Sequence, residues 1–484
     1  MNKFVKRFFT LALLLAFGLL LVGCGDVTNN GGNVTTDAGV SDYDRTIVFY
    51  STQGDALQKK TDIAIKAFEA KYPGWTVKHV TVGGYDDVKA KIVSDLQGSL
   101  QPDLAYCYAD HVAQYIQTRK VVDMTQFINS TATVTDGSGK EVAVGYTAEQ
   151  IADFVPGYYA EGLATNYGDY AKYGYSETAM LTMPFVKSTE LLYVNETALI
   201  NAGFKKLNDK NETVADVATT WDELWAQGAK LKSKYPTATL LGYDSEANWF
   251  ITMCEQNGWG YTTADSANHY LFNNENTKTW LSKLNEYYEK GYIVTQMDYG
   301  AYTSNLFTKG ADDGGVIYCI GSSGGASYQA TENFDWGVYH IPGSVLADGS
   351  VSKKVISQGP SLVMLYCDKA KDQNEKATMT FMFLKELLDP TFQATFSIQS
   401  GYNPCTQSSY EVEAYIEHLS DPSKITAVAC QVAKEMTNDF FTSPAFVGSS
   451  TARDQVGNAL NFAVTGGKSA ENALLDAYKN CGGK

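Results

Sequence analysis

The stretch that decides the fold is LTMPFVKSTELLYVN, residues 181–195. It approaches Pro184 through apolar residues, becomes polar from Lys187 to Glu190, and closes with the apolar run Leu191–Val194. Proline fixes φ and disfavours a helical residue before it, so the approach is predicted to be extended. A short apolar run with a polar centre is typical of a chain that leaves one packed body, crosses an open gap and begins a second. An edge strand with a solvated bulge fits the same pattern.

Residues 1–23 are predicted to be a signal peptide. Cations within the first seven residues precede an apolar run from Phe8 to Val22, which is the layout of a secretory signal. That run is short for a spanning helix, which needs about 20 apolar residues. It ends in LVGC, residues 21–24, which resembles a bacterial lipobox whose cysteine carries the lipid. Cys24 is therefore the predicted lipid anchor; an ordinary signal peptide or an amino-terminal anchor helix is the alternative.

Residues 24–44 are predicted to be a flexible tether. They contain few large apolar side chains, so ordering them would bury too little surface to offset the lost conformational entropy. The folded part is then expected outside the cytoplasm, held by lipid to the outer face of a bacterial cell membrane.

Charge and cysteine usage exclude several classes of protein. The formal net charge is −16, which argues against nucleic acid and against a basic grip on anionic lipid. The seven cysteines beyond Cys24 have no CxxC spacing, and several lie inside apolar runs, so they are predicted to act as small hydrophobic residues. The five histidines are scattered. No metal and no cofactor is expected.

From Thr46 onward, strand and helix patterns alternate. Strands are predicted at 46–50, 76–82 and 104–108, with helices at 55–72 and 87–97. This βαβαβ order implies a parallel sheet covered on both faces. Ligands of such sheets bind at the carboxyl ends of the strands, where this chain places Gln53, Tyr108 and Asp110.

The rest of the chain continues the α/β pattern. Residues 131–175 are predicted to be a surface excursion with some helix, and Thr220-Trp-Asp-Glu223 is a capping box that begins a helix. Further helices are predicted at 246–256, 277–288, 376–388, 453–464 and 469–478, and further strands at 315–320, 336–341 and 361–366.

One motif suggests an enzyme. Gly321-Ser-Ser-Gly-Gly325 follows a predicted strand and matches the Gly-x-Ser-x-Gly elbow of serine hydrolases, with Ser323 as nucleophile. The elbow requires a helix directly after the serine, and the following glycines make a poor helix start. No HExxH, Walker, GxGxxG or EF-hand motif is present. A binding protein is therefore favoured over an enzyme.

In this order, the pieces resemble the extracellular solute-binding proteins of ABC importers, specifically the carbohydrate-binding group that includes maltose-binding protein. The resemblance covers nearly all of the chain after the lipobox. Its pieces are Ile47–Thr52, Tyr72–Gly74, Pro102–Leu104, Met183–Phe185, Tyr193–Asn195, Thr220–Leu224, Phe307–Gly310, Trp336–Val338 and Gly401–Pro404. Departures from the family pattern occur at residues 310–316 and 194–196. The resemblance implies a two-lobed periplasmic-binding-protein-like fold, in which each lobe is a mainly parallel sheet flanked by helices and crossing hinge strands join the lobes.

Candidate ligand contacts follow from the chemistry of sugars. Sugar hydroxyls need hydrogen-bond partners when desolvated, and the CH face of a pyranose lies well on an aromatic ring. Asp110 matches the family's acidic contact, although it could also cap its helix, and Trp249 fits a core position as well as a platform. The predicted contacts are Gln53, Tyr108, Asp110, Ser188, Thr189, Glu190, Trp249, Trp259, Tyr318, Ser322, Ser323, Gln358 and Tyr402. Trp221, Trp225 and Trp280 are assigned to packing.

The prediction is a lipid-anchored binding protein that captures a sugar or oligosaccharide by hinge closure and delivers it to ABC permease subunits. The N-lobe is expected to comprise residues 45–186 and 357–403, and the C-lobe residues 187–356 and 404–484. A monomer is expected, with no nucleic acid partner and no membrane contact except through the lipid. The alternatives are a binding protein for a polyol, peptide or glycerophosphodiester, or a secreted serine hydrolase.

Overall fold

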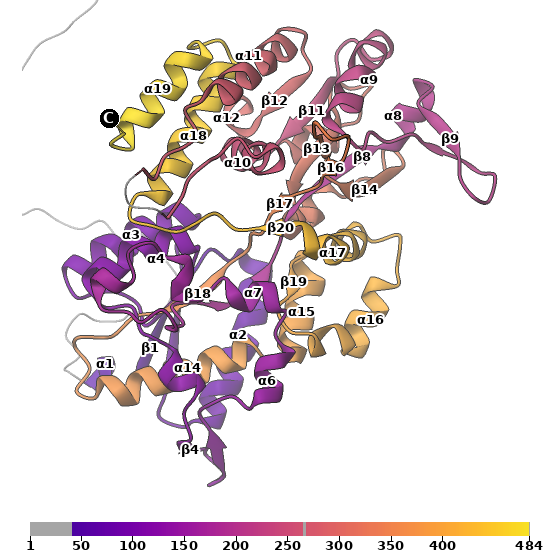
Figure 1. Ribbon diagram of the computed structural model, residues 1–484. Helices are drawn as coiled ribbons and strands as arrows, with labels where there is room; N and C mark the ends of the chain where they lie inside the picture. Colours follow the sequence, from indigo (N-terminus) through magenta and orange to yellow (C-terminus); the bar gives the residue numbers. More distant parts are fainter. Residues whose placement is uncertain (1–40, 265–267, 484) are drawn as a thin grey trace, which may run out of the picture. The chain divides into compact units, whose positions relative to one another are not determined.

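The computed structural model describes residues 41–264 and 268–483 (Figure 1). The predicted signal peptide, Cys24 and residues 25–40 of the predicted tether lie outside this range. Residues 41–45, at the end of that tether, form α1 (Ser41–Arg45), and the Lys371 N–H donates to Asp44 Oδ1 at 2.8 Å. The last tether residues are thus attached to the folded body through a polar contact that their apolar content could not reveal.

The first lobe is built on a five-stranded sheet of order β2-β1-β3-β18-β6. Its strands are β2 (Thr76–Thr81), β1 (Thr46–Ser51), β3 (Leu104–Cys107), β18 (Ser361–Met364) and β6 (Met183–Pro184). The pairs β1–β2 and β1–β3 are parallel, whereas β18 runs antiparallel to both of its neighbours. Four of the five strands therefore point the same way.

Both faces of this N-lobe sheet are covered, as the βαβαβ pattern predicts. Phe49 and Leu104 belong to one buried cluster, and the next residues along their strands, Tyr50 and Ala105, belong to another. The covering helices are α2 (Asp55–Lys71), α3 (Tyr85–Gln97), α4 (Ala109–Tyr115), α14 (Gln373–Leu387) and α15 (Pro390–Ser400). Helix α2 buries Ala64, Ile65 and Phe68, at the spacing of one helical face.

The second lobe repeats this topology in the order β12-β11-β13-β8-β14. Its strands are β12 (Ile293–Thr295), β11 (Thr239–Tyr243), β13 (Val316–Ser322), β8 (Glu190–Asn195) and β14 (Trp336–His340). Strand β8 is antiparallel to both neighbours, while β11 is parallel to both of its own. The main helices are α9 (Trp221–Lys234), α10 (Glu246–Asn257), α11 (Glu275–Glu289), α18 (Ser449–Val464) and α19 (Ala470–Asn480). The Thr220–Glu223 capping box forms at the start of α9 as predicted.

Short segments join the two sheets. The chain leaves β6, passes through β7 (Val186–Lys187) and enters β8, and it returns from β17 (Val355–Ile356) to β18. These two crossings pair with each other, since Ser188 and Gln358 exchange backbone hydrogen bonds of 2.9 and 2.8 Å. Strand β20 (Phe440–Phe441) pairs with β17, and β19 (Asn403–Pro404) pairs with β7.

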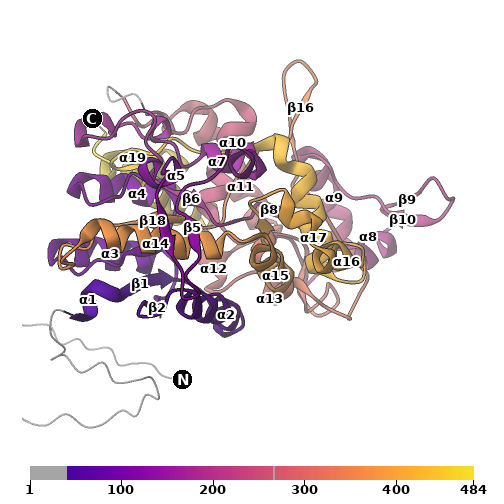
Figure 2. The ribbon, with the colours of Figure 1, turned by 90° about the horizontal axis from the view of Figure 1, so that it is seen from below.

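The predicted surface excursion forms the β4–β5 hairpin (Thr133–Thr135 and Glu141–Ala143) and helices α6 (Ala148–Asp153) and α7 (Pro156–Ala160). A second hairpin, β9–β10 (Lys205–Leu207 and Thr213–Ala215), stands away from the rest of the C-lobe in both views (Figure 1 and Figure 2). The other helices are α5 (Thr125–Ile128), α8 (Glu196–Asn201), α12 (Gln296–Tyr299), α13 (Ser304–Phe307), α16 (Glu413–Leu419) and α17 (Ile425–Glu435). The 3₁₀ helices are η1 (Ile116–Thr118), η2 (Ala164–Asn166), η3 (Ala171–Tyr173), η4 (Ser323–Gln329), η5 (Ser408–Glu411) and η6 (Met436–Asp439), and the last hairpin pairs β15 (Ser344–Val345) with β16 (Val351–Ser352).

Three further observations bear on the predictions made from the sequence. A 3₁₀ helix does follow Ser322, although the glycines there were expected to disfavour one. Seven free cysteines are present in the described chain, five of them buried. Within residues 41–264 and 268–483, no helix combines the length and hydropathy that a bilayer crossing needs.

Candidate ligand-binding site

A cavity of about 80 Å³ lies where the two lobes and their connecting segments meet. The N-lobe contributes Tyr108 and Asp110, which follow the carboxyl end of β3, and the C-lobe contributes Arg453 from α18. The full lining is Tyr108, Ala109, Asp110, Glu161, Thr182, Lys187, Ile251, Tyr261, Ile356, Ser357, Gln358, Gly359, Ser361, Thr442, Ser443, Pro444, Ser449 and Arg453. This location agrees with the rule that open α/β sheets bind ligands beyond the carboxyl ends of their strands.

The N-lobe wall is aromatic and acidic. Tyr108 is the N-cap residue of α4, and its ring stacks on that of Tyr85 with centroids 4.5 Å apart. Asp110 lies in the first turn of α4 rather than at its N-cap, and its side chain is 17% exposed. The wall therefore combines ring faces with one accessible carboxylate.

A buried ion pair between Lys187 and Glu161 leaves this part of the cavity wall without net charge. Lys187 Nζ lies 2.5 Å from Glu161 Oε2, and the two side chains are 3% and 15% exposed. The Ser357 hydroxyl donates to the other oxygen of Glu161 at 2.5 Å. The Lys187 ammonium is thus already neutralised by the protein, and it is not a free anion-binding group.

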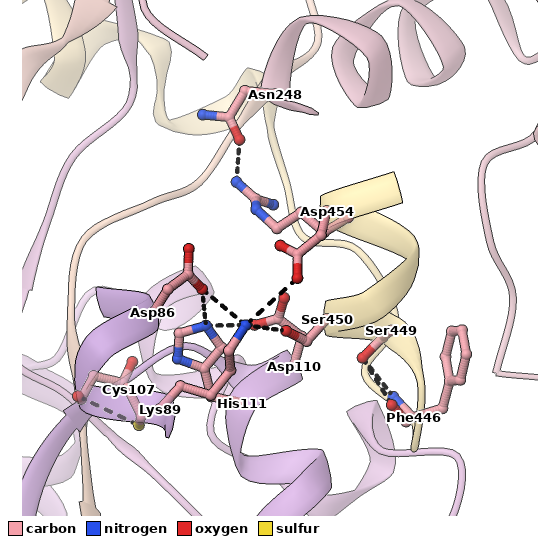
Figure 3. A network of polar contacts seen from close by, with 12 residues as sticks. Asp86, Lys89, Cys107, Asp110, His111, Asn248, Phe446, Ser449, Ser450 and Asp454 are labelled. Atoms are coloured by element: carbon pink, nitrogen blue, oxygen red, sulfur yellow. Dashed lines mark hydrogen bonds and ion pairs between the residues drawn. The ribbon is translucent and has the colours of Figure 1, made fainter. Parts of the chain in front are cut away.

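A hydrogen-bond chain connects the cavity to the start of β8. Arg453 donates to the side-chain oxygen of Asn248, a bond visible in Figure 3, and the Asn248 amide donates to Glu190 Oε1 at 3.0 Å. The Tyr243 hydroxyl donates to Glu190 Oε2 at 2.5 Å. Burial raises the pKa of Glu190 to about 7. This buried carboxyl therefore holds the amide that orients Arg453.

The two lobes also contact each other beside the cavity. Lys89 of α3 lies 2.8 Å from Asp86 on its own helix, and it reaches α18, where it donates to Ser450 Oγ at 2.8 Å and lies 3.7 Å from Asp454 (Figure 3). Asp110 is drawn next to this network (Figure 3). The described conformation is thus one in which polar groups of the lobes are engaged with each other.

Three of the predicted contacts line the cavity: Tyr108, Asp110 and Gln358. Tyr402 lies near them, because its hydroxyl is 3.5 Å from that of Tyr85, which stacks on Tyr108. Gln53 is buried after the carboxyl end of β1, and its amide donates to Tyr106 at 2.5 Å.

All four residues of the polar centre of the first crossing are buried in this conformation, and of them only Lys187 lines the cavity. Ser188, Thr189 and Glu190 are at most 3% exposed, and each has partners inside the protein. The returning segment supplies the partners of Ser188 and Thr189, whereas Tyr243 and Asn248 supply those of Glu190. The order of polar residues along the chain does not reveal which distant residues will pair with them. Glu190 thus acts on the cavity indirectly: it accepts a hydrogen bond from Asn248, which in turn accepts one from Arg453.

The predicted tryptophan and tyrosine platforms of the C-lobe lie elsewhere. Trp249 and Tyr318 have no exposed surface and belong to the C-lobe core. Trp249 stacks on Tyr243 at 4.7 Å, and the Tyr318 hydroxyl donates to Gln227 at 2.6 Å. Trp259 packs against the same core, with its ring 6.0 Å from Trp280. The structure therefore does not bring these three rings to the cavity.

In the glycine-rich segment after β13, residues 321–325, the predicted contact Ser323 is also buried. Ser323 has no exposed surface, and its hydroxyl accepts a hydrogen bond from the Thr189 N–H at 3.3 Å. A nucleophile must reach its substrate, so this burial removes the basis of the hydrolase alternative. Ser322 is partly exposed and accepts from the Gly324 N–H at 3.1 Å. Tyr402 lies over Gly324, because a Cβ there would come within 2.6 Å of its ring.

Sequence reasoning missed Glu161, Lys187, Tyr261 and Arg453. Glu161 and Tyr261 sit in irregular segments that gave no signal. Lys187 was part of the quoted crossing but was not chosen. Arg453 could have been found, because the chain contains only four arginines and this one lies within a helix that follows a polar segment.

A cavity lined by two α/β lobes and by the strands that join them defines a two-lobed solute receptor. Residues 64–421 match the family model described as bacterial extracellular solute-binding protein. The chain belongs to that family and is a solute-binding protein of the ABC-importer class. The resemblance inferred from the sequence and the two-lobed fold class are confirmed.

Known relatives differ in what their names say they bind. The sn-glycerol-3-phosphate-binding periplasmic protein UgpB of Escherichia coli K12 is 23% identical over 410 residues, covering 83% of this chain and 80% of that protein. The crystal structure of UgpB from Mycobacterium tuberculosis, in complex with glycerophosphocholine, has a TM-score of 0.68 at 18% identity, covering 90% of this chain and 97% of that one. The GacH receptor of Streptomyces glaucescens, solved unliganded and with acarbose, has a TM-score of 0.66 at 18% identity, covering 90% and 98%.

Proposed function

We propose that the protein captures a neutral sugar or oligosaccharide outside the cell and passes it to an ABC permease. The observation that carries this proposal is a cavity lined from both lobes in which charge is balanced and hydroxyl, amide and tyrosine groups predominate. Such groups can pair the hydroxyls of a polyol, while Tyr108 and Tyr261 offer ring faces to its CH surfaces.

Charge balance favours a neutral solute. The Lys187–Glu161 pair contributes no net charge, and Arg453 faces a cavity that also contains the Asp110 carboxylate. A neutral solute can bridge Asp110 and Arg453 through hydroxyls without leaving either charge uncompensated. An anionic solute would bring its charge towards Asp110 in a partly buried site, where repulsion is less screened than in water.

Capture is proposed to occur by hinge closure. The cavity of about 80 Å³ is much smaller than the roughly 300–1,000 Å³ of pockets that hold drug-sized ligands. A sugar therefore reaches it only when the lobes separate, and it binds most tightly when both walls touch it. That difference in affinity shifts the population towards a closed form.

A glycerophosphodiester is the second candidate, and Arg453 is the observation that favours it. A guanidinium can hold two phosphate oxygens at once, and relatives named for sn-glycerol-3-phosphate and glycerophosphocholine are similar to this chain. In this alternative, Asp110 and the tyrosines would hold the non-phosphate end of the solute.

The remaining features of the proposal follow from the sequence. The protein is proposed to be a monomer, held by lipid on Cys24 to the outer face of the cell membrane, and to perform no reaction on its ligand. The lobe boundaries given above remain part of the proposal. The relatives named here are described as binding proteins, which supports the absence of catalysis.

A thermal-shift screen of the mature chain tests the choice of solute. The panel contains glucose, maltose, maltotriose, sn-glycerol-3-phosphate and glycerophosphocholine. A ligand present at 100 times its Kd stabilises the folded state by about 2.7 kcal/mol. A shift with a sugar supports the main proposal, and a shift with the phosphodiester alone replaces it with the second candidate. If all five compounds leave the melting temperature unchanged, both candidates fail.

A further inference from the structure

A second cavity lies within the C-lobe, between helices α9, α10 and α11 and beside strand β15. Its volume is about 170 Å³, and it shares no lining residue with the cavity between the lobes. It is lined by Trp221, Asp222, Trp225, Trp249, Met253, Asn257, Trp280, Lys283, Leu284, Tyr287, Gly343, Ser344 and Val345.

Four of the seven tryptophans of the chain line this one cavity. The rings of Trp225 and Trp249 are nearly parallel to that of Trp221, at 20° and 26° and at centroid distances of 6.3 and 5.9 Å. Trp280 stands at 81° to Trp249. Of these rings, Trp225 and Trp280 remain partly exposed, whereas Trp249 has no exposed surface and Trp225 already stacks on Tyr287 at 4.4 Å.

Two polar residues at the rim of this cavity already have a hydrogen-bond or ion-pair partner, whereas a third has none among the described residues. Asn257 donates to Ser344 Oγ at 2.9 Å, and Lys283 pairs with Glu286 at 2.7 Å. Asp222 is exposed, and its carboxylate forms no hydrogen bond or ion pair with any residue of the described chain. One acceptor group with free oxygens thus stands beside the aromatic walls.

We propose that this cavity is a second carbohydrate-binding site, which takes one neutral sugar ring independently of the site between the lobes. An engineered cavity of about 150 Å³ admits benzene, so about 170 Å³ can admit the CH face of a six-membered ring while its hydroxyls, which benzene lacks, extend towards the exposed Asp222. The apolar CH face of a pyranose would lie on tryptophan, and Asp222 would accept hydrogen bonds from two adjacent hydroxyls.

The cation–π contact already present on the rim favours a neutral ligand over a cation. Aromatic walls with a nearby carboxylate can also hold a quaternary ammonium through cation–π attraction. Here Lys283 Nζ already lies 5.4 Å from the centroid of Tyr287, one of the lining rings. Glu286 neutralises this ammonium, but a second cation would still have to share the Tyr287 ring with it, whereas a sugar would not.

The test separates the two sites with one variant at each. Val345 lines the cavity and is 49% exposed, so Val345→Trp should block the opening without removing a core contact. Val351→Trp is the matched control, because Val351 pairs with Val345 across the same hairpin, is 42% exposed and does not line the cavity. Asp110→Asn weakens the site between the lobes. Melting temperatures of all variants show that each remains folded.

The full mature chain is titrated with methyl β-D-glucopyranoside, using saturation-transfer NMR and tryptophan fluorescence. The expected result is a tryptophan response that Val345→Trp weakens at least tenfold and that Val351→Trp and Asp110→Asn leave within twofold. The inference is overturned if the sugar gives no tryptophan response, if Asp110→Asn abolishes it, or if Val345→Trp leaves it unchanged. A response to tetramethylammonium without one to the sugar would also overturn it.

Discussion

The two lobes contain sheets of the same topology, but the acid buried at a strand start has different partners in each: Asp103 directly before β3 and Glu190 at the start of β8. In each sheet the fourth strand is antiparallel and begins directly after a crossing, β18 in the N-lobe and β8 in the C-lobe. The N-lobe buries Asp103 beside the Lys376 ammonium, 3.0 Å away, with both side chains at most 4% exposed. The C-lobe buries Glu190 beside Tyr243 and Asn248, which are neutral.

This difference separates a structural role from a functional one. The Asp103 carboxylate also accepts from the Val48 N–H at 2.8 Å, so it ties α14 to β1 within the core of the lobe. Among the described residues, no cation pairs directly with Glu190, which reaches Arg453 through one amide. The paired acid joins two elements of the N-lobe core, whereas the acid with neutral donors is linked to Arg453, which lines the cavity.

The largest loss of stability is expected when the Asp103–Lys376 ion pair of the N-lobe is broken. Lys376→Met leaves the Asp103 carboxylate buried without its cation, and breaking a buried pair in this way costs about 3–5 kcal/mol. Denaturant unfolding at pH 7 measures the loss. Lys371→Met is the control, because Lys371 pairs with Asp44 at 3.4 Å while 71% exposed, and exposed pairs contribute about 0–1 kcal/mol. If both variants lose the same free energy of unfolding, the buried Lys376 pair is no more stabilising than the exposed Lys371 pair.

The next effect concerns Glu190 and pH. Burial raises its pKa from 4.5 to about 7, so the unfolded state loses its proton first as pH rises. Glu190 therefore lowers the free energy of unfolding progressively between about pH 4.5 and 7, by up to about 3 kcal/mol at 1.36 kcal/mol per pKa unit. Glu190→Gln should remove most of this fall, measured as the difference in unfolding free energy between pH 5 and pH 8.

Asp103 of the N-lobe provides the internal control for the predicted pH dependence of stability. Asp103 also has a pKa raised to about 6 by burial, so it contributes a fall of the same sign that Glu190→Gln should leave in place. A variant with the full pH dependence of the wild type would mean that Glu190 is ionised in the folded state throughout this range.

A smaller effect is expected at the cavity itself. Asp110→Asn keeps the shape of the side chain but removes its charge, and hydrogen bonds to charged groups contribute about 1.5–3 kcal/mol. Sugar affinity should fall about tenfold or more, as measured by calorimetry on the ligand found in the screen. Asp62→Asn is the control, because Asp62 is exposed on α2 and does not line the cavity. Tighter binding in Asp110→Asn would instead indicate an anionic solute.

The sequence predicted the two-lobed α/β fold because the relevant signals are local. The alternation at 46–108, the capping box at Thr220 and the proline before the crossing each depend on neighbours along the chain. The predicted residues that line the cavity are Tyr108 and Asp110, which follow a strand end, and Gln358, which lies in the polar segment before β18. The pairing of Ser188 with Gln358, or of Lys187 with Glu161, joins residues far apart in sequence. Such contacts decide whether a polar side chain faces a ligand or a neighbour, and periodicity contains no information about them.

The last prediction asks whether the two lobes are coupled through surface charge. Lys89 joins α3 to Ser450 and Asp454 on α18, and its side chain is only 14% exposed. Lys89→Met removes this contact from the closed form only, whereas the pair with Asp86 on the same helix is lost in both forms. Since a partly exposed pair contributes about 0.5–1 kcal/mol, ligand affinity should fall about two- to fivefold, and small-angle scattering should show a larger radius of gyration without ligand. Lys91→Met is the matched control, because Lys91 pairs with Asp95 on the same helix, 3.1 Å away, and does not reach the other lobe. If both variants bind equally well, this contact does not favour closure, and the coupling between the lobes rests on the crossing strands alone.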